Sequence, residues 1–231
     1  MPSFGGNIPH QLRSPDGTSI RPIFFSRREI ALLLSKTVSP GFGELKAGTI
    51  LAENVSNLST GNKGLLVPYM PDTISTTDTG RTFLTQTPGA SDSFVYVPLD
   101  DSYRFAVGDD IVIGYATTYT NGGAITAIDR TTYPNQAKIT FTTAFAGTGA
   151  SYTVAAKACC WPECGTSGKY STAKYILEQA VDTGNDEDAK GALASVVISN
   201  ATLYKGNLTN YDSQAATDLS ATTDGQYLIL K

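Results

Sequence analysis

Short apolar runs bounded by glycine, proline or polar residues recur along this chain and predict β-strands. Two such runs, 46–53 and 63–69, are joined by a connection rich in Asn, Ser and Gly, and they predict one pair of strands. A second pair is predicted downstream, where 174–181 leads through an acidic turn at 182–190 into 193–198. We expect the two pairs to form one β-domain.

The stretch between the two pairs, residues 71–167, carries a strand pattern of its own. Five short strands at intervals of roughly ten residues are typical of a small barrel or sandwich. They are predicted at 94–97, within 105–113 after a Gly-Asp turn, and at 122–129, 137–142 and 151–154. Because Pro, Gly or Ser residues bound both ends of the stretch, we expect a tolerated surface insertion. Replacing 75–165 by a short Gly/Ser linker is therefore expected to leave a folded core.

The chain before the first strand pair is less regular. Residues 1–22 are rich in Pro and Gly and predict an arm, whose isolated apolar residues Phe4, Ile8 and Ile20 are suited to docking on a partner. An ordinary frayed terminus is the alternative. The segment 23–34 fits either a strand pair or a short helix.

At the other end of the chain, a strand and a loop are predicted within 200–210. Asp212 is placed to cap a short helix over 213–219, and 226–230 predicts a closing strand.

Composition narrows the classes of partner. The chain of 231 residues has a formal net charge of −4 and no basic run, so we expect no direct nucleic-acid partner and no membrane surface. Charged residues make up 16%, below the usual quarter, which suits repeated packing against protein neighbours but also fits an ordinary β-protein. No targeting segment is recognised at 1–10, and the apolar run 30–34 is too short to span a bilayer, so folding in a cytoplasm is expected.

Three cysteines lie close together at Cys159, Cys160 and Cys164, beside Trp161. Their spacing fits no common zinc pattern, because adjacent cysteines cannot readily point at one ion. The only histidine, His10, lies in the predicted arm. We expect reduced cysteines or a local or inter-subunit disulfide rather than a metal site.

Acidic residues at 182–188 and two Asp pairs are the remaining candidates for chemistry. The acidic run lacks the ligand spacing of a calcium loop and predicts a solvated hairpin turn. Asp100-Asp101 and Asp109-Asp110 are more simply turn residues, although a carboxylate pair of the glycosidase type stays open. No phosphate loop, nucleophile elbow or Ser/His pair is found, so we expect neither an enzyme nor a cofactor.

The predicted strands outside the insertion follow a recognisable order. Gly48-Thr49-Ile50-Leu51 is followed by Lys63-Gly64-Leu65-Leu66-Val67-Pro68-Tyr69, then by Ile176-Leu177-Glu178-Gln179-Ala180-Val181-Asp182 and the strand 194–198, and the end matches through Leu219 and Gly225. This order resembles that of the lambda-type head decoration (capsid cement) proteins of tailed bacteriophages. The resemblance covers roughly 40–70 and 170–231. The insertion departs from it, and is similar to small β-modules of other phage structural proteins.

The resemblance implies a mainly β fold: a β-barrel or β-tulip-like core with a short helix, built from 23–70 and 168–231 and carrying an inserted small β-barrel or sandwich at 71–167. It also implies a homotrimer that binds the major capsid protein on the outer surface of the expanded virion capsid and stabilises it against internal DNA pressure. Synthesis would take place in the bacterial host cytoplasm. The arm, 1–22, would become ordered on the shell by adding a strand to it.

The trimer expectation is also motivated by the apolar residues Leu65, Val67 and Tyr69, which we expect to be exposed on short strands. Two other classes remain open. One is a virion fibre or tail-associated protein that binds a receptor or carbohydrate through the inserted module, and the other is an enzyme such as a depolymerase.

Overall fold

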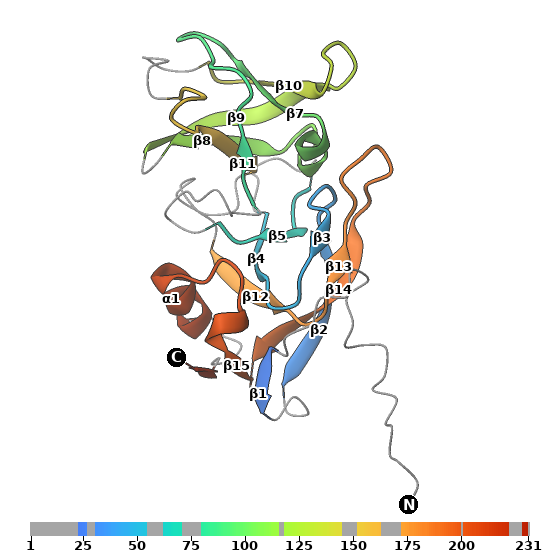
Figure 1. Cartoon of the computed structure of the whole chain (residues 1–231), viewed down its shortest axis with the longest axis vertical. Helices are drawn as coiled ribbons and strands as arrows, with labels where there is room; N and C mark the ends of the chain where they lie inside the picture. Colours follow the sequence, from blue (N-terminus) through green and yellow to red (C-terminus); the bar gives the residue numbers. More distant parts are fainter. Residues whose placement is uncertain are drawn as a thin grey trace, which may run out of the picture.

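The chain forms a mainly β structure with one short α-helix among the residues described, as predicted (Figure 1). The structure is a computed structural model. It describes residues 23–26, 31–54, 62–70, 80–115, 118–144, 152–162, 172–199, 201–221 and 228–230. Two sheet systems dominate it: a closed barrel of five strands and a separate sheet of six strands.

The barrel has the strand order β12-β14-β2-β5-β4 and closes between β4 and β12. Its strands are β2 (Leu32–Val38), β4 (Ile50–Glu53), β5 (Leu66–Pro68), β12 (Ala173–Leu177) and β14 (Ala192–Ser199). β4 pairs with β5 and β12 pairs with β14, both antiparallel, so the two predicted strand pairs exist and belong to one closed sheet. Strand β2 joins them, pairing with β14 along its length and with β5 at Val38.

In β4 and β14, successive buried residues enter two different apolar clusters. Leu51 and Val196 belong to a central cluster, whereas Ile50 and Val197 belong to a C-terminal cluster. The central cluster comprises Val38, Phe42, Leu45, Leu51, Ala52, Leu66, Val67, Met70, Val112, Cys159, Trp161, Leu177, Ala194 and Val196. The C-terminal cluster comprises Ile23, Ile50, Tyr69, Ala173, Ile176, Val197, Ala201, Leu203, Ala215 and Leu219.

This double burial corrects the expectation that Leu65, Val67 and Tyr69 present an apolar surface. Val67 and Tyr69 are fully buried and Leu65 is half-buried. Strand β5 is part of the barrel wall and is covered on both faces: Leu66 and Val67 belong to the central cluster, and Tyr69 belongs to the C-terminal cluster. The Tyr69 hydroxyl donates to Asp212 Oδ1 at 3.1 Å, which fixes the ring beneath the helix.

The predicted strand 174–181 is interrupted in the structure. β12 ends at Leu177, and β13 (Val181–Asp182) pairs instead with β3 (Glu44–Leu45). The break falls at Glu178, which is buried: its N–H donates to Ser195 O at 2.9 Å and its carboxylate accepts from the Ser195 hydroxyl. Glu178 is therefore still bound to β14, and the chain leaves the barrel after it to pair with β3.

The C-terminal segment covers one end of the barrel. β15 (Thr202–Tyr204) pairs with β1 (Phe24–Ser26) and β16 (Leu228–Leu230), and the short 3-10 helix η4 (Lys205–Asn207) follows β15. Helix α1 (Ser213–Ala221) begins after Asp212, whose Oδ1 accepts from the Ala215 N–H at 2.7 Å, so the predicted cap is confirmed. The strand alternative for 23–34 is correct where that segment is described. None of the described helices has the length and apolar character needed to cross a bilayer.

The second sheet has the order β6-β11-β8-β9-β10-β7, and all of its strands lie between residues 82 and 162. Its strands are β6 (Thr82–Phe83), β7 (Phe94–Pro98), β8 (Asp110–Tyr115), β9 (Thr118–Asp129), β10 (Gln136–Phe141) and β11 (Cys159–Pro162). A bond from Thr85 N–H to Tyr96 O, 2.9 Å, brings the two sheet edges together. The domain boundaries 71–167 stay a prediction, although the described strands of this region pair only with one another.

Strand prediction within this sheet was correct for β7, β8, β9 and β10 and wrong for 151–154. The described part of that segment, 152–154, enters a turn in which Thr153 O accepts from Ala156 N–H and Ala158 N–H and Lys157 has a φ of 57°. The two remaining strands of the sheet, β6 and β11, were not predicted, and β11 holds two of the cysteines. Tyr152 is still buried against the sheet, which explains its apolar signal in the sequence.

Candidate functional site

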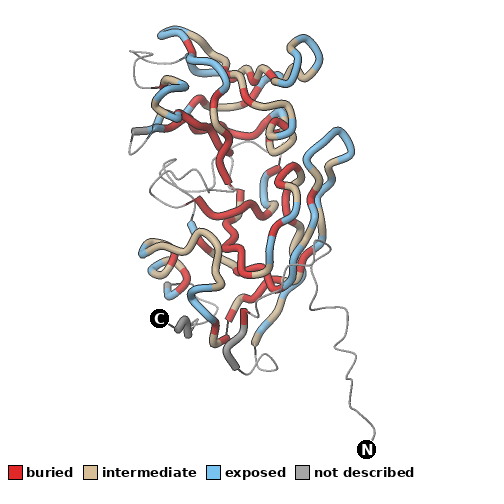
Figure 2. Tube along the Cα trace, viewed as in Figure 1, coloured by how far each residue is buried: buried red, intermediate tan, exposed pale blue. Residues whose placement is uncertain are grey.

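The barrel and the six-stranded sheet share one apolar core, visible as buried segments that continue from one to the other (Figure 2). Met70 and Val67 enter the central cluster from the barrel side, and Trp161 and Val112 enter it from the sheet. Trp161 is only 2% exposed, and the Arg81 guanidinium carbon lies 4.7 Å from its ring centroid. We call this contact region, with its polar flanks, the joint.

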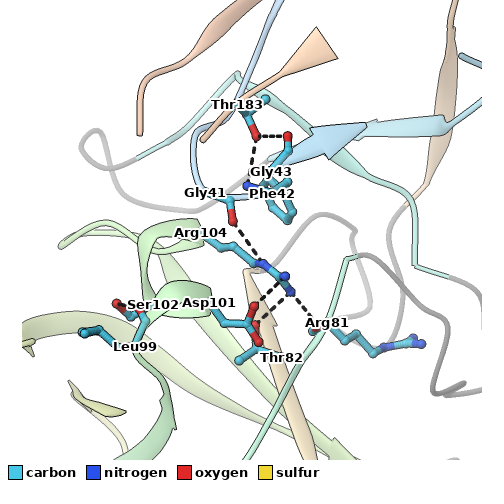
Figure 3. A network of polar contacts seen from close by, with 10 residues as sticks. All are labelled: Gly41, Phe42, Gly43, Arg81, Thr82, Leu99, Asp101, Ser102, Arg104 and Thr183. Atoms are coloured by element: carbon cyan, nitrogen blue, oxygen red, sulfur yellow. Dashed lines mark hydrogen bonds and ion pairs between the residues drawn. The ribbon is translucent and has the colours of Figure 1, made fainter. Parts of the chain in front are cut away.

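Arg104 forms the first polar flank of the joint (Figure 3). It ends the 3-10 helix η3 (Asp100–Arg104), and its Nη2 lies 2.6 Å from Asp101 Oδ1. Its Nη1 donates to Arg81 O at 2.8 Å, and its Nε donates across the joint to Gly41 O at 3.2 Å. The guanidinium carbon lies 5.5 Å from the Phe42 ring centroid. A planar fork of donors on a largely buried side chain fixes direction as well as distance.

The backbone at Gly41 lies directly against η3. A Cβ atom added at Gly41 would lie 2.2 Å from the Tyr103 carbonyl carbon, and Gly41 has a φ of 90°, so only glycine fits. Thr183 holds this loop from the barrel side (Figure 3): its hydroxyl accepts from Phe42 N–H at 3.0 Å and donates to Gly43 O at 3.0 Å. The loop that receives Arg104 is therefore itself fixed.

Asp109 forms the second polar flank of the joint. Its side chain is fully buried and accepts from Ala106 N–H at 2.9 Å within the sheet. It also accepts from Asn62 N–H at 2.7 Å, from Asn62 Nδ2 at 3.3 Å and from Asn54 Nδ2 at 3.5 Å. Burial raises the pKa of Asp109, and the hydrogen bonds from Asn62 and Ala106 oppose that shift. Sequence reasoning took Asp109 as a turn residue and missed its second role, because the partners lie far away in the chain.

Asp101 was also read as a simple turn residue. Burial raises the pKa of its carboxyl, while the charge of Arg104 opposes the shift. The two residues lie one helical turn apart in the sequence, and their side chains are only 16% (Arg104) and 27% (Asp101) exposed. The sequence gives no sign that Asp101 binds Arg104 at the joint, since Asp-Asp before Ser is common in turns.

The described cysteines lie side by side on β11 and point to opposite faces. Cys159 belongs to the central cluster, and Cys160 belongs to the cluster inside the six-stranded sheet. Both are fully buried and neither is bonded to another described cysteine, and burial raises the pKa of the Cys160 thiol well above its usual value. Buried thiols with raised pKa values are poor nucleophiles and poor metal ligands. Cys164 lies outside the described residues, so the predicted disulfide stays a prediction.

The other candidate residues are partly described. Phe4, Ile8 and Ile20 of the predicted arm lie outside the described residues. In the acidic turn, Asp182 Oδ1 accepts from Gly184 N–H at 2.9 Å and Asp186 Oδ1 accepts from Asp188 N–H at 3.1 Å, so these carboxylates cap their own backbone. Across the described chain, no group of three or more His, Cys, Asp or Glu side chains is gathered to hold a metal ion.

Comparisons with known proteins found no family model, no curated protein and no solved structure that matches this chain. The function must therefore be argued from the residues and their arrangement.

Proposed function

We propose that this protein is a capsid decoration (cement) protein of a tailed bacteriophage, which binds the expanded head as a homotrimer through contacts with the major capsid protein. The proposed role is mechanical rather than catalytic. It consists of holding neighbouring capsid subunits together from the outer surface of the virion.

One observation carries the proposal: the separate segments that resemble the decoration family meet in one barrel. Gly48–Leu51 leads into β4, Lys63–Tyr69 contains β5, Ile176–Asp182 covers the end of β12 and all of β13, and 194–198 lies in β14. More than a hundred residues separate the second segment from the third in the chain, yet β4 pairs with both β5 and β12. A resemblance by chance would not require its parts to be neighbours in space.

The loop after β15 strengthens this argument, because it lies within the range 170–231 that the resemblance covers and returns to the first motif. Thr209 N–H donates to Gly48 O at 3.0 Å, and Ile50 N–H donates to Thr209 O at 3.3 Å. Asn210 Nδ2 donates to Tyr69 O at 2.9 Å. The Gly-Thr motif, the Val-Pro-Tyr motif and the loop after β15 are thus one connected unit.

Exposed leucines on the β2–β14 ribbon are the apolar groups that the proposal assigns to subunit or shell contacts. Leu193 is 73% exposed, Leu32 is 48% exposed and Leu34 is 42% exposed. They replace Leu65, Val67 and Tyr69 in that role. Single contacts of this kind are weak, but three linked copies raise the effective affinity strongly.

Binding to expanded, empty heads assembled from the cognate major capsid protein tests the proposal. Co-sedimentation should show saturable binding to expanded heads, weaker binding to unexpanded proheads, and a higher temperature of head disruption after binding. Leu193→Ser and Leu34→Ser should weaken binding or trimer formation. Leu193→Ala, which removes the same three carbons but adds no polar hydroxyl, should weaken it less.

Two results would contradict the proposal. One is the absence of binding to expanded heads by a folded protein. The other is a stable monomer in sedimentation both in solution and on the shell.

A further inference from the structure

The outer face of the six-stranded sheet carries a small hollow that the joint does not use. It has a volume of about 240 Å³ and lies along β7 and the loop before it. Gln86, Thr87, Pro88, Asp92, Phe94, Val95 and Tyr96 line it. This volume lies below the range of roughly 300–1,000 Å³ that drug-sized ligands occupy, so the hollow suits a single small ring.

Aromatic rings form the floor of the hollow and are fixed by one another. The Phe94 and Tyr96 ring centroids are 5.6 Å apart at an interplanar angle of 80°. Tyr96 makes a second edge contact with Tyr133, at 5.0 Å and 82°. Lys138 Nζ lies 4.0 Å from the Phe94 centroid. Edge contacts with Phe94 and Tyr133 hold the Tyr96 ring, and Tyr96 together with Lys138 over one face holds the Phe94 ring, so both rings are fixed before any ligand arrives.

Polar groups with hydrogen-bonding capacity to spare form the rim. Asp92 Oδ2 accepts from Gly89 N–H at 2.7 Å, which uses one of about four lone pairs on the carboxylate. Gln86 Nε2 donates to Gln136 Oε1 at 3.2 Å, which leaves the Gln86 carbonyl as an acceptor. Thr87 Oγ1 accepts from Val154 N–H at 3.1 Å, which leaves its hydroxyl proton to donate.

We propose that this hollow binds one neutral hexopyranose unit of a glycan. A pyranose ring has one face of C–H groups that packs against aromatic rings, and a belt of hydroxyls that both donate and accept. Phe94 and Tyr96 provide the apolar platform, and Asp92, Gln86 and Thr87 provide fixed acceptors and one donor. Asp92 lines the hollow, whereas Lys138 does not line it and its ammonium is engaged with the Phe94 ring, so the negative charge of Asp92 disfavours an acidic sugar. This inference does not depend on shell binding, because the hollow lies on the sheet and the shell contacts are assigned to the barrel.

Methyl glycosides of glucose, galactose, mannose and N-acetylglucosamine are the probes, used with the full-length protein in saturation-transfer NMR and calorimetric titration. At least one should bind with a dissociation constant on the order of millimolar, as expected for so small a ligand. The methyl glycoside of N-acetylneuraminic acid should not bind.

Variants locate the binding. Asp92→Asn and Tyr96→Leu should each weaken it at least roughly tenfold, a change that corresponds to about 1.4 kcal/mol. Tyr119→Leu is the matched control: Tyr119 is an exposed tyrosine on β9 of the same sheet and does not line the hollow. Thermal unfolding of every variant verifies that the sheet is folded.

Three results would overturn the inference: no binding of any neutral glycoside, preference for the acidic one, or equal affinities for Tyr96→Leu and Tyr119→Leu. Because head binding is measured separately, loss of one activity leaves the other interpretable.

Discussion

The barrel and the six-stranded sheet are built from opposite kinds of strand pairing. In the sheet, β8, β9 and β10 follow one another in the chain and pair as neighbours. In the barrel, β4 pairs with β12 and β2 pairs with β14 across the whole of the other region. Pairing between strands far apart in the chain costs more loop-closure entropy before the contacts form. The stability of the barrel therefore depends on the region between its two halves, which is the six-stranded sheet.

The two regions also differ in how they use their surfaces. The sheet strands β7 and β10 alternate between buried and half-buried residues, with one face left for solvent. The barrel strands β4 and β5 are buried on both faces, and part of that cover comes from the sheet through Trp161 and Val112. Residues of the sheet therefore complete the apolar core of the barrel. A surface insertion that can be removed without effect would not do this.

Removing the sheet is the most severe way to break this relationship. Replacing 75–165 by a Gly/Ser linker should lower the unfolding free energy of the barrel by on the order of 5 kcal/mol, because Met70 and Val67 lose their apolar cover. This result would overturn the sequence-based expectation of an independent core. Denaturant unfolding measures it. A Gly-Ser-Gly replacement of the exposed turn residues 186–188 is the control and should change little, whereas an unchanged midpoint after the large replacement would refute the shared core.

Emptying the joint of its largest side chain should have the next largest effect. Trp161→Ala should lower the unfolding free energy by about 3–5 kcal/mol. Hydrogen exchange should then speed up in β4 and β5 as well as in β8 and β11, because the cavity touches both regions. Ile139→Ala, in the cluster inside the sheet, is the comparison: its faster exchange should be concentrated in β7 to β10. Similar exchange patterns for the two variants would mean that the joint does not transmit stability.

Two arginines allow a finer test: Arg104 is the last residue of the 3-10 helix η3, and Arg130 binds the same helix from outside. Arg104 reaches across the joint to Gly41 O, whereas Arg130 donates to Ser102 Oγ at 2.8 Å and to Ser102 O at 2.9 Å within the sheet. Arg104→Ala should cost about 2–4 kcal/mol and speed exchange in 41–43. Arg104→Lys should recover only part of this, since one ammonium cannot replace the fork. Arg130→Ala should destabilise the sheet and leave hydrogen exchange in 41–43 unchanged. Faster exchange in 41–43 after Arg130→Ala but not after Arg104→Ala would contradict the role given to Arg104.

The buried carboxylate gives the smallest effect and a dependence on pH. Asp109→Asn should cost about 1–3 kcal/mol, because an amide cannot accept all four N–H donors. The folded-state pKa of Asp109 lies above its ordinary value of 3.8, so the folded protein holds the proton more tightly than the unfolded chain. Stability from this group is therefore full below pH 3.8 and is lost as the pH rises through the folded pKa. Urea unfolding from pH 4 to 7 should show a decline in the unfolding free energy of wild type that Asp109→Asn lacks. Parallel pH profiles for the two proteins would exclude Asp109 as the source of the decline.

Sequence patterns revealed the sheet better than the barrel, and burial explains why. The alternation in 137–142 is visible because one face of β10 meets solvent. In β5 no such alternation exists, so Val67 and Tyr69 read as exposed apolar residues when both are internal. The burial of Glu178 just after β12 could not be predicted either, because its partner Ser195 lies on another strand.

The joint was not predictable from sequence, whereas the helix cap was. Asp212 acts within three residues of itself, so its pattern is local and it was identified correctly. Arg104 and Asp109 act on Gly41 and Asn62, which lie 63 and 47 residues away. Only folding brings such partners together, and the hydrophobic periodicity of the sequence gives no sign of these contacts.

The barrel pairing also sets an order of events during translation. A ribosome that has completed β2, β4 and β5 must still synthesise the whole sheet before β12 and β14 emerge, which takes on the order of ten seconds at roughly 5–20 residues per second. During that interval β5 can pair with β4 and β2, but the barrel stays open because β12 and β14, which close it, are still missing. The sheet is complete first, ending at Pro162, and it presents Trp161 where Met70 comes to rest. In a nascent chain stalled shortly after that point, the completed sheet would already cover apolar residues of the unfinished barrel.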